Sequence, residues 1–88
     1  MLWWWLSFAD EEKLRGIVIV QAPSFLLAVA ESHRLQINPH GEVRGFPFPS
    51  ELTPPEQFRN RCLTREEAEE LDRWAGDQLD RDRGAGGV

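Results

Sequence analysis

The chain has 88 residues, with 15 acidic and 10 basic side chains, a formal net charge of −5 and a hydrophobic fraction of 41%. A chain of this length forms one domain, and its acidic balance argues against binding a nucleic-acid polymer, whose phosphates require clustered Lys and Arg. Its one cysteine, Cys62, excludes an internal disulfide, so we expect a reducing, cytoplasmic compartment. The apolar runs are far shorter than the about 20 residues that a membrane-spanning helix needs, and we expect no membrane partner.

Two strands are predicted at the start of the chain. Residues 2–8, LWWWLSF, are aromatic, and residues 16–22, GIVIVQA, are rich in β-branched side chains, and both compositions favour strands. The acidic stretch between them is short enough for an antiparallel hairpin. Because residues 17–20 are apolar at every position, both faces of the second strand need cover. Alternation along the first strand gives two sets, one of Trp4, Leu6 and Phe8 and one of Trp3, Trp5 and Ser7.

A helix is predicted after the second strand, because Ser24 is a typical N-cap and helix-forming residues follow it. The helix is expected to end near residues 38–41, NPHG, since Asn38 precedes a proline and Gly41 allows a turn. Residues 42–49, EVRGFPFP, are predicted to form a third strand, and Pro47 within it favours an edge position.

A short extended piece at residues 59–63, RNRCL, precedes a second predicted helix over residues 64–79. Thr64 and Glu67 form a capping box, which is a specific signal for a helix start. We therefore predict an α+β fold of order β-β-α-β-(β)-α, in two layers, with a small antiparallel sheet and both helices on one face. Residues 1–79 form a single compact domain in this prediction, and residues 80–88 form a disordered C-terminal tail.

The row of three tryptophans needs an explanation in so small a chain. Trp4 is expected in the core, and Trp3 and Trp5 then point to a sheet face that two helices on the other side leave open. A small domain with that much exposed apolar surface usually buries it in a partner. One interpretation is a homodimer or higher oligomer packed sheet against sheet, and another is an exposed platform for a ligand.

No catalytic set stands out in the sequence. His33 is expected on the apolar side of the first helix and His40 in the turn, and Cys62 has no reactive signature around it. These three residues do not have the spacing of a zinc site. We therefore expect a protein that is not an enzyme and that carries no metal and no cofactor.

Two local groups could bind an anion. The backbone amides of the turn with Asn38 and Gly41 could form an anion-holding nest, and a plain helix-to-strand turn is the alternative. If residues 59–61 are extended, Arg59 and Arg61 point the same way and Asn60 the other, so that two guanidinium groups could clamp one phosphate or carboxylate. Surface ion pairing with nearby glutamates is the alternative.

The order WLSFAD, GIVIVQAPSFLLAV, INPHGEVRGFPFP and RNRCLTREEAEEL resembles a family of small uncharacterised proteins from bacteria and their phages. The resemblance covers about residues 4–72, and INPxGEV and NRxLTxEE are its specific motifs. The family carries no assigned activity, so the resemblance implies one compact domain and a bacterial or phage setting. In size alone, the chain is also similar to small phage oligomers that sequester nucleotide signals of host immunity.

The sequence is compatible with two functions. The first is a non-enzymatic homo-oligomer that binds a small anionic ligand such as a nucleotide, with Trp3 or Trp5 on the base, Arg59 and Arg61 on phosphate, and Asn60, Asn38 and Gly41 fixing orientation. The alternative is a protein–protein interaction module, an adaptor or inhibitor, that uses the aromatic sheet face. Arginines in a concave pocket would favour the ligand, and arginines paired with Glu66, Glu67 or Glu70 on a flat surface would favour the interaction module.

Overall fold

The two N-terminal strands form a long antiparallel hairpin. In the computed structural model, which describes residues 1–11 and 13–86, β1 (Leu2–Asp10) pairs with β2 (Lys13–Ala22). Both strands are longer than predicted, because the pairing continues until Asp10 lies opposite Lys13. The first strand is thus long enough to carry the tryptophans at one end and polar side chains at the other.

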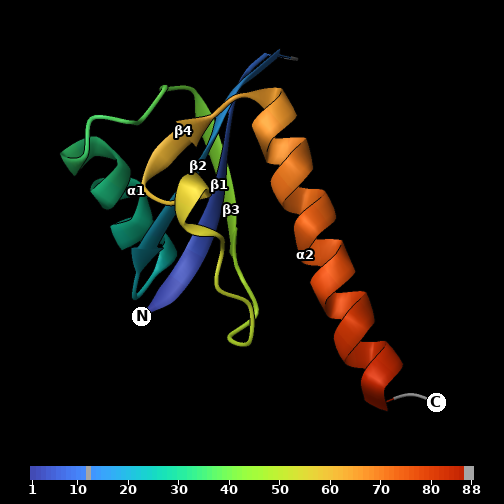
Figure 1. The fold of residues 1–88 in the computed structure, drawn as a ribbon. Helices are drawn as coiled ribbons and strands as arrows, with labels where there is room; N and C mark the ends of the chain where they lie inside the picture. The colour runs from blue at the N-terminus through green and yellow to red at the C-terminus, as the bar shows by residue number, and fades with distance from the viewer. Residues whose placement is uncertain (12, 87–88) are drawn as a thin grey trace.

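Among the described residues the sheet has four strands, in the order β3-β1-β2-β4, and every neighbouring pair is antiparallel (Figure 1). β3 (Glu42–Pro47) pairs with β1, and β4 (Arg61–Leu63) pairs with β2. The predicted α+β class with an antiparallel sheet is confirmed. The edge position of the third strand is also confirmed, because β3 lies at the end of this order. Pro47 predicts this position, since a proline has no N–H to donate to a further strand.

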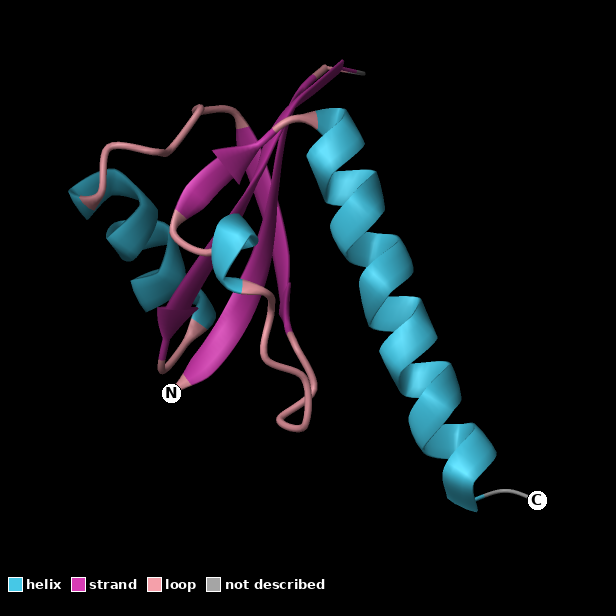
Figure 2. Cartoon of the chain, viewed as in Figure 1, coloured by secondary structure: helices cyan, strands magenta, loops and turns pink. Residues whose placement is uncertain are grey.

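The two helices lie on opposite faces of the sheet, as Figures 1 and 2 show. Helix α1 (Phe25–Arg34) packs on the face that carries Val18 and Val20, and α2 (Arg65–Gly86) packs on the face that carries Ile17 and Ile19. The predicted two layers, with both helices on one face, are therefore corrected to three layers. The physical reason is the apolar run at residues 17–20, which needs a cover of its own on each face.

Each helix begins at the predicted cap. The Oγ of Ser24 accepts a hydrogen bond from the N–H of Leu27 at 3.3 Å. The N–H of Glu67 donates to Thr64 Oγ1 at 3.2 Å, and the N–H of Thr64 donates to Glu67 Oε1 at 3.1 Å, which completes the capping box. The sequence predicts a tail from residue 80, whereas α2 continues to Gly86, and residues 87 and 88 lie outside the described residues.

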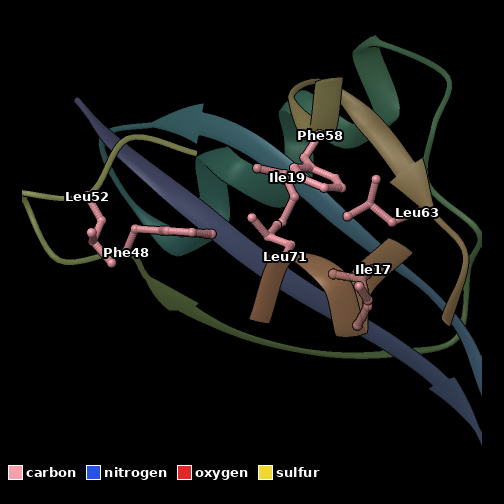
Figure 3. Close-up of a cluster of buried hydrophobic side chains, with 8 residues drawn as sticks. Ile17, Ile19, Phe48, Leu52, Phe58, Leu63 and Leu71 are labelled. Atoms are coloured by element: carbon pink, nitrogen blue, oxygen red, sulfur yellow. The ribbon is translucent and has the colours of Figure 1, made fainter. Parts of the chain in front are cut away.

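In the part of the chain that the structure describes, two hydrophobic clusters form the core, one on each side of the sheet. The cluster under α1 consists of Trp4, Leu6, Phe8, Val18, Val20, Ala22 and Ala28. The cluster under α2, shown in Figure 3, consists of Ile17, Ile19, Phe48, Leu52, Phe58, Leu63, Ala68 and Leu71. The second cluster includes the segment after β3 and the short 3₁₀ turn η1 (Glu56–Phe58), which both cover the sheet beside α2.

The three tryptophans have different environments. Trp4 is 8% exposed, its indole Nε1 donates to the carbonyl of Ala22 at 3.0 Å, and its ring centroid lies 6.2 Å from that of Phe25. Trp3 and Trp5 are half-buried against the cluster under α2. Trp4 is therefore the core residue, as predicted, and the face of Trp3 and Trp5 is partly covered rather than open.

Candidate functional site

The two arginines of the predicted anion clamp point to different partners. Arg59 lies over the Trp3 ring, with its Cζ 5.3 Å from the ring centroid, and its Nε donates to the carbonyl of Pro54 at 2.7 Å. Arg61 pairs with Glu67 of α2, with Nη2 2.6 Å from Oε2. Asn60 between them has a φ of 55°, so the backbone is not continuously extended and the expected same-side alternation does not hold.

The contact between Arg61 and Glu67 ties β4 to the first turn of α2. The pKa of Glu67 is lowered from its ordinary value, first by the backbone hydrogen bond from Thr64 and then by the Arg61 guanidinium. This is the surface ion pair that the sequence offers as the alternative to a clamp, with both side chains partly exposed. The arrangement favours a structural role for Arg61 at the start of the helix.

Replacing Glu67 with glutamine is expected to lower stability at neutral pH and to change it little in acid. The pKa of the Glu67 carboxyl is lower in the folded state, so its ionised form stabilises the fold. This contribution to the free energy of unfolding is fully present above the unfolded-state pKa, and it is lost as the pH falls through the folded-state pKa. The measurement is the urea midpoint of both chains at about pH 7 and at about pH 3. The same loss at both pH values would contradict the assignment, and Glu69→Gln serves as the exposed control.

The turn with Asn38 and Gly41 uses its polar groups within the chain. Asn38 Nδ2 donates to the buried Ser32 Oγ at 2.9 Å, and Asn38 Oδ1 accepts from the N–H of His40 at 2.7 Å. Gly41 has a φ of 108°, and a Cβ at this position would lie 2.6 Å from the carbonyl oxygen of Ala9. These contacts are those of a plain turn that connects α1 to β3.

The predicted ligand-binding residues therefore lie in separate places. Gly41 sits against Ala9, near the end of β1, whereas Trp3 lies near its start, and six residues of strand separate the two by about 20 Å. Trp5 and Arg61 contact different elements again, β3 and α2. A nucleotide site built from all of these residues stays a prediction, and the structure does not bring its parts together.

The cysteine and the two histidines show no catalytic arrangement among the described residues. Burial, and then the charge of Glu67, raise the pKa of the Cys62 thiol. The Cys62 Sγ packs against Gly16, where an added Cβ would lie only 2.6 Å from the sulfur. A raised pKa disfavours the thiolate, which is the reactive form. The rings of His33 and His40 lie 5.9 Å apart, but among residues 1–11 and 13–86 no group of three or more His, Cys, Asp or Glu side chains is arranged to hold a metal ion.

An apolar groove lies between α2 and the edge strand β3. Its volume is about 350 Å³, and it is lined by Trp5, Leu14, Ile17, Phe46, Arg65, Ala68, Glu69 and Asp72. Phe46 is 55% exposed, and its ring stacks on that of Trp5 with centroids 5.9 Å apart and an interplanar angle of 15°. The sequence predicts an aromatic surface that includes Trp5. Leu14 reaches this surface through the β1-β2 hairpin, and Phe46 reaches it through the β3-β1 pairing, which sets Phe46 opposite Trp5.

The α2 wall of the groove is acidic. Glu69 and Asp72 contribute two carboxylates, and Arg65 contributes one guanidinium, whose Nε lies 3.8 Å from Glu69 Oε1. One guanidinium against two carboxylates leaves the wall with a net negative charge. A surface with an aromatic floor and a charged rim has the composition of a protein-binding site.

No protein family, curated protein or solved structure matches this chain. The resemblance to small bacterial and phage proteins therefore stays a prediction. In the part of the chain that the structure describes, no helix is both long and apolar enough to span a membrane.

Proposed function

We propose that the protein is a non-enzymatic interaction module that binds a helical segment of a partner protein in the groove between α2 and β3. The observation that carries this proposal is the exposed Phe46 ring stacked on Trp5 beside an apolar hollow. Aromatic side chains in a partly desolvated pocket are the usual anchors of protein interfaces. The chain therefore acts by occupying a surface of its partner, as an adaptor or an inhibitor does.

The width of the sheet supports a helix as the bound segment. Four strands at about 4.8 Å spacing span about 19 Å, whereas one helix with its side chains is about 10 Å across. Helix α2 packs against β2 and β4, which leaves the half formed by β1 and β3 beside it. One further helix fills that half, with Trp5 and Phe46 in contact with its apolar face.

The length of the free half-face sets the length of the bound segment. Phe48 and Leu52 cover the end of the face near Trp3, so the free part runs from Trp5 to the end of β1 at Asp10. Five residues of strand span about 16 Å, which corresponds to about 11 residues of helix. A segment of about three turns therefore suffices.

Charge supports a basic partner segment. Glu69 and Asp72 outnumber Arg65 on the wall of the groove, and the whole chain has a net charge of −5. Lysine or arginine on the flank of the bound helix would face these carboxylates, and such complementarity raises the association rate and selects the partner. The pairing of Arg61 with Glu67 is consistent with this function, because that arginine is engaged within the chain.

A Phe46→Ser variant is expected to lose binding to a basic amphipathic helix. The probe is a synthetic peptide of about 14 residues with leucines on one face and lysines on the other, measured by titration calorimetry. Loss of a central aromatic anchor weakens an interface by about 2 kcal/mol or more, which is about 30-fold in Kd. Asp72→Lys is expected to weaken binding as well, because it reverses a charge on the groove wall.

Leu26→Ser is the matched control, because Leu26 is an exposed apolar residue on α1, on the opposite face of the sheet. This variant should bind the peptide as the wild-type chain does. The same peptide with glutamates in place of lysines should bind weakly. Equal loss in the Leu26 and Phe46 variants, or equal binding of both peptides, would contradict the proposed function.

A further inference from the structure

The outer edge of β3 presents unpaired backbone groups. The N–H of Phe48 donates to the carbonyl of Trp3 at 2.8 Å, in register with the β3-β1 ladder. Because backbone groups alternate along a strand, the even-numbered residues of β3 face β1, and Val43, Gly45 and Pro47 turn theirs outward. Among the described residues, β3 is the last strand on this side of the sheet. Five of its six residues are exposed.

We propose that two copies of this chain pair through β3, edge to edge and antiparallel, and so form one continuous eight-stranded sheet. The two-fold axis passes through Gly45, so that Gly45 lies opposite its own copy and Val43 lies opposite Pro47 of the other chain. This pairing is distinct from the predicted sheet-against-sheet dimer, because it joins the outer edge of β3, the last strand of the described sheet on this side, and not a sheet face.

The backbone of β3 is self-complementary in this register. The outward N–H groups of β3 belong to Val43 and Gly45, since Pro47 has none. Each Gly45 N–H donates to the opposite Gly45 carbonyl, and each Val43 N–H donates to the opposite Pro47 carbonyl. Every outward donor thus finds an acceptor, and Pro47, which cannot donate, lies where only its carbonyl is needed.

The side chains are complementary in the same register. On the α2 face, Arg44 of each chain lies opposite Phe46 of the other, which brings a guanidinium to a residue that is 55% exposed in the single chain. Moving the axis to Arg44 would set two arginines directly opposite each other, which is unfavourable. Moving the axis to Val43 would set Phe46 opposite His40, which has left-handed backbone, and leave the ring uncovered.

A Val43→Pro variant tests the pairing by sedimentation velocity over micromolar to submillimolar concentrations. The N–H of Val43 faces outward, so proline removes a donor between chains and none to β1. We expect the wild-type chain to reach twice the monomer mass, Val43→Pro to stay monomeric, and Val43→Ala, which keeps the N–H, to dimerise. Equal thermal unfolding of the two variants checks that both fold. A wild-type chain that stays monomeric throughout would overturn the proposal.

Cysteine cross-linking tests the register. In a Cys62→Ser background, which removes the free cysteine, Arg44→Cys and Phe46→Cys are made as single variants and mixed. The residues face each other as a non-hydrogen-bonded pair with Cα atoms about 4.5 Å apart, which suits a disulfide. We expect an oxidised dimer from the mixture and little from either variant alone. Equal cross-linking in all three samples would overturn the register and the proposal.

The pairing does not rest on the proposed function, and the two can fail separately. Val43 and its outward N–H are not part of the groove, whereas Glu69 and Asp72 line the groove and lie on α2, away from the edge of β3. Val43→Pro should therefore abolish the dimer and still bind the peptide, because the single chain keeps the whole groove. Asp72→Lys should weaken peptide binding and leave the dimer.

Discussion

Replacing Trp4 with alanine is expected to destabilise the protein by about 3–5 kcal/mol, the range for a large aromatic residue removed from a core. Trp4 is 8% exposed, packs on Phe25 of α1 and lies opposite Val20 of β2. The substitution also leaves the buried carbonyl of Ala22 without the indole donor that it has at 3.0 Å. A domain of this size is stable by about 0.05–0.15 kcal/mol per residue, so the loss is a large fraction of the total.

The measurement is urea unfolding followed by far-ultraviolet circular dichroism, with Trp5→Ala as the matched control. Trp5 is half-buried at the edge of the groove, so its removal leaves a smaller cavity in a place that water already reaches. We expect Trp5→Ala to lower the free energy of unfolding clearly less than Trp4→Ala does. Similar losses in the two variants would contradict the assignment of Trp4 to the core and Trp5 to the groove.

Replacing Leu71 with alanine is expected to destabilise the protein by about 2–5 kcal/mol. Leu71 is fully buried and lies at the centre of the cluster that joins α2 to the sheet, as Figure 3 shows. Tertiary packing of the apolar stripe provides most of the stability of a helix in a protein. Without the Leu71 contact, the charged surface of α2 would do little to hold the helix on the sheet. The variant should therefore also weaken the groove, which α2 forms on one side.

Leu26→Ala is the control for this substitution, because it makes the same chemical change at a side chain that is 76% exposed. Substitutions on the surface usually change stability by less than about 0.5 kcal/mol. The two leucine variants are compared by their urea midpoints. A loss at Leu26 as large as the loss at Leu71 would contradict the packing of α2 against the sheet.

The local structure could be predicted from the sequence because short-range rules determine it. Alternation along β1 assigns Trp4 to one face and Trp3 and Trp5 to the other, and both assignments agree with the structure. Ser24 and Thr64 cap the two helices as expected, because their hydroxyl groups satisfy the free N–H groups of a first turn.

The arrangement of the helices could not be predicted by the same rules. A sequence does not state on which side of a sheet a connection crosses, and the two helices were expected on one face. The apolar residues at 17–20 carried the relevant signal, since a strand that is buried on both faces requires a layer on each side. The consequence is that the tryptophan face is half covered by α2 and by the segment around Phe48.

The site was difficult to predict for a different reason. Arg59 and Arg61 look like a pair only if the backbone between them is extended, and the left-handed conformation of Asn60 turns them apart. Asparagine adopts this conformation more readily than most residues, which is a weak signal in a sequence. The groove depends on long-range pairing, which brings Phe46 beside Trp5 across 41 positions of the chain (46 minus 5). Local sequence patterns do not predict such a pairing.

The most direct test of the binding groove is an NMR titration of the ¹⁵N-labelled chain with the basic amphipathic peptide. We expect the largest shifts at the indole N–H of Trp5 and at the amides of Phe46, Leu14, Glu69 and Asp72, with the hydrogen-bonded indole N–H of Trp4 nearly unchanged. Shifts centred on α1 at Leu26 and Leu27, or spread evenly over the chain, would contradict binding of the helix in the groove.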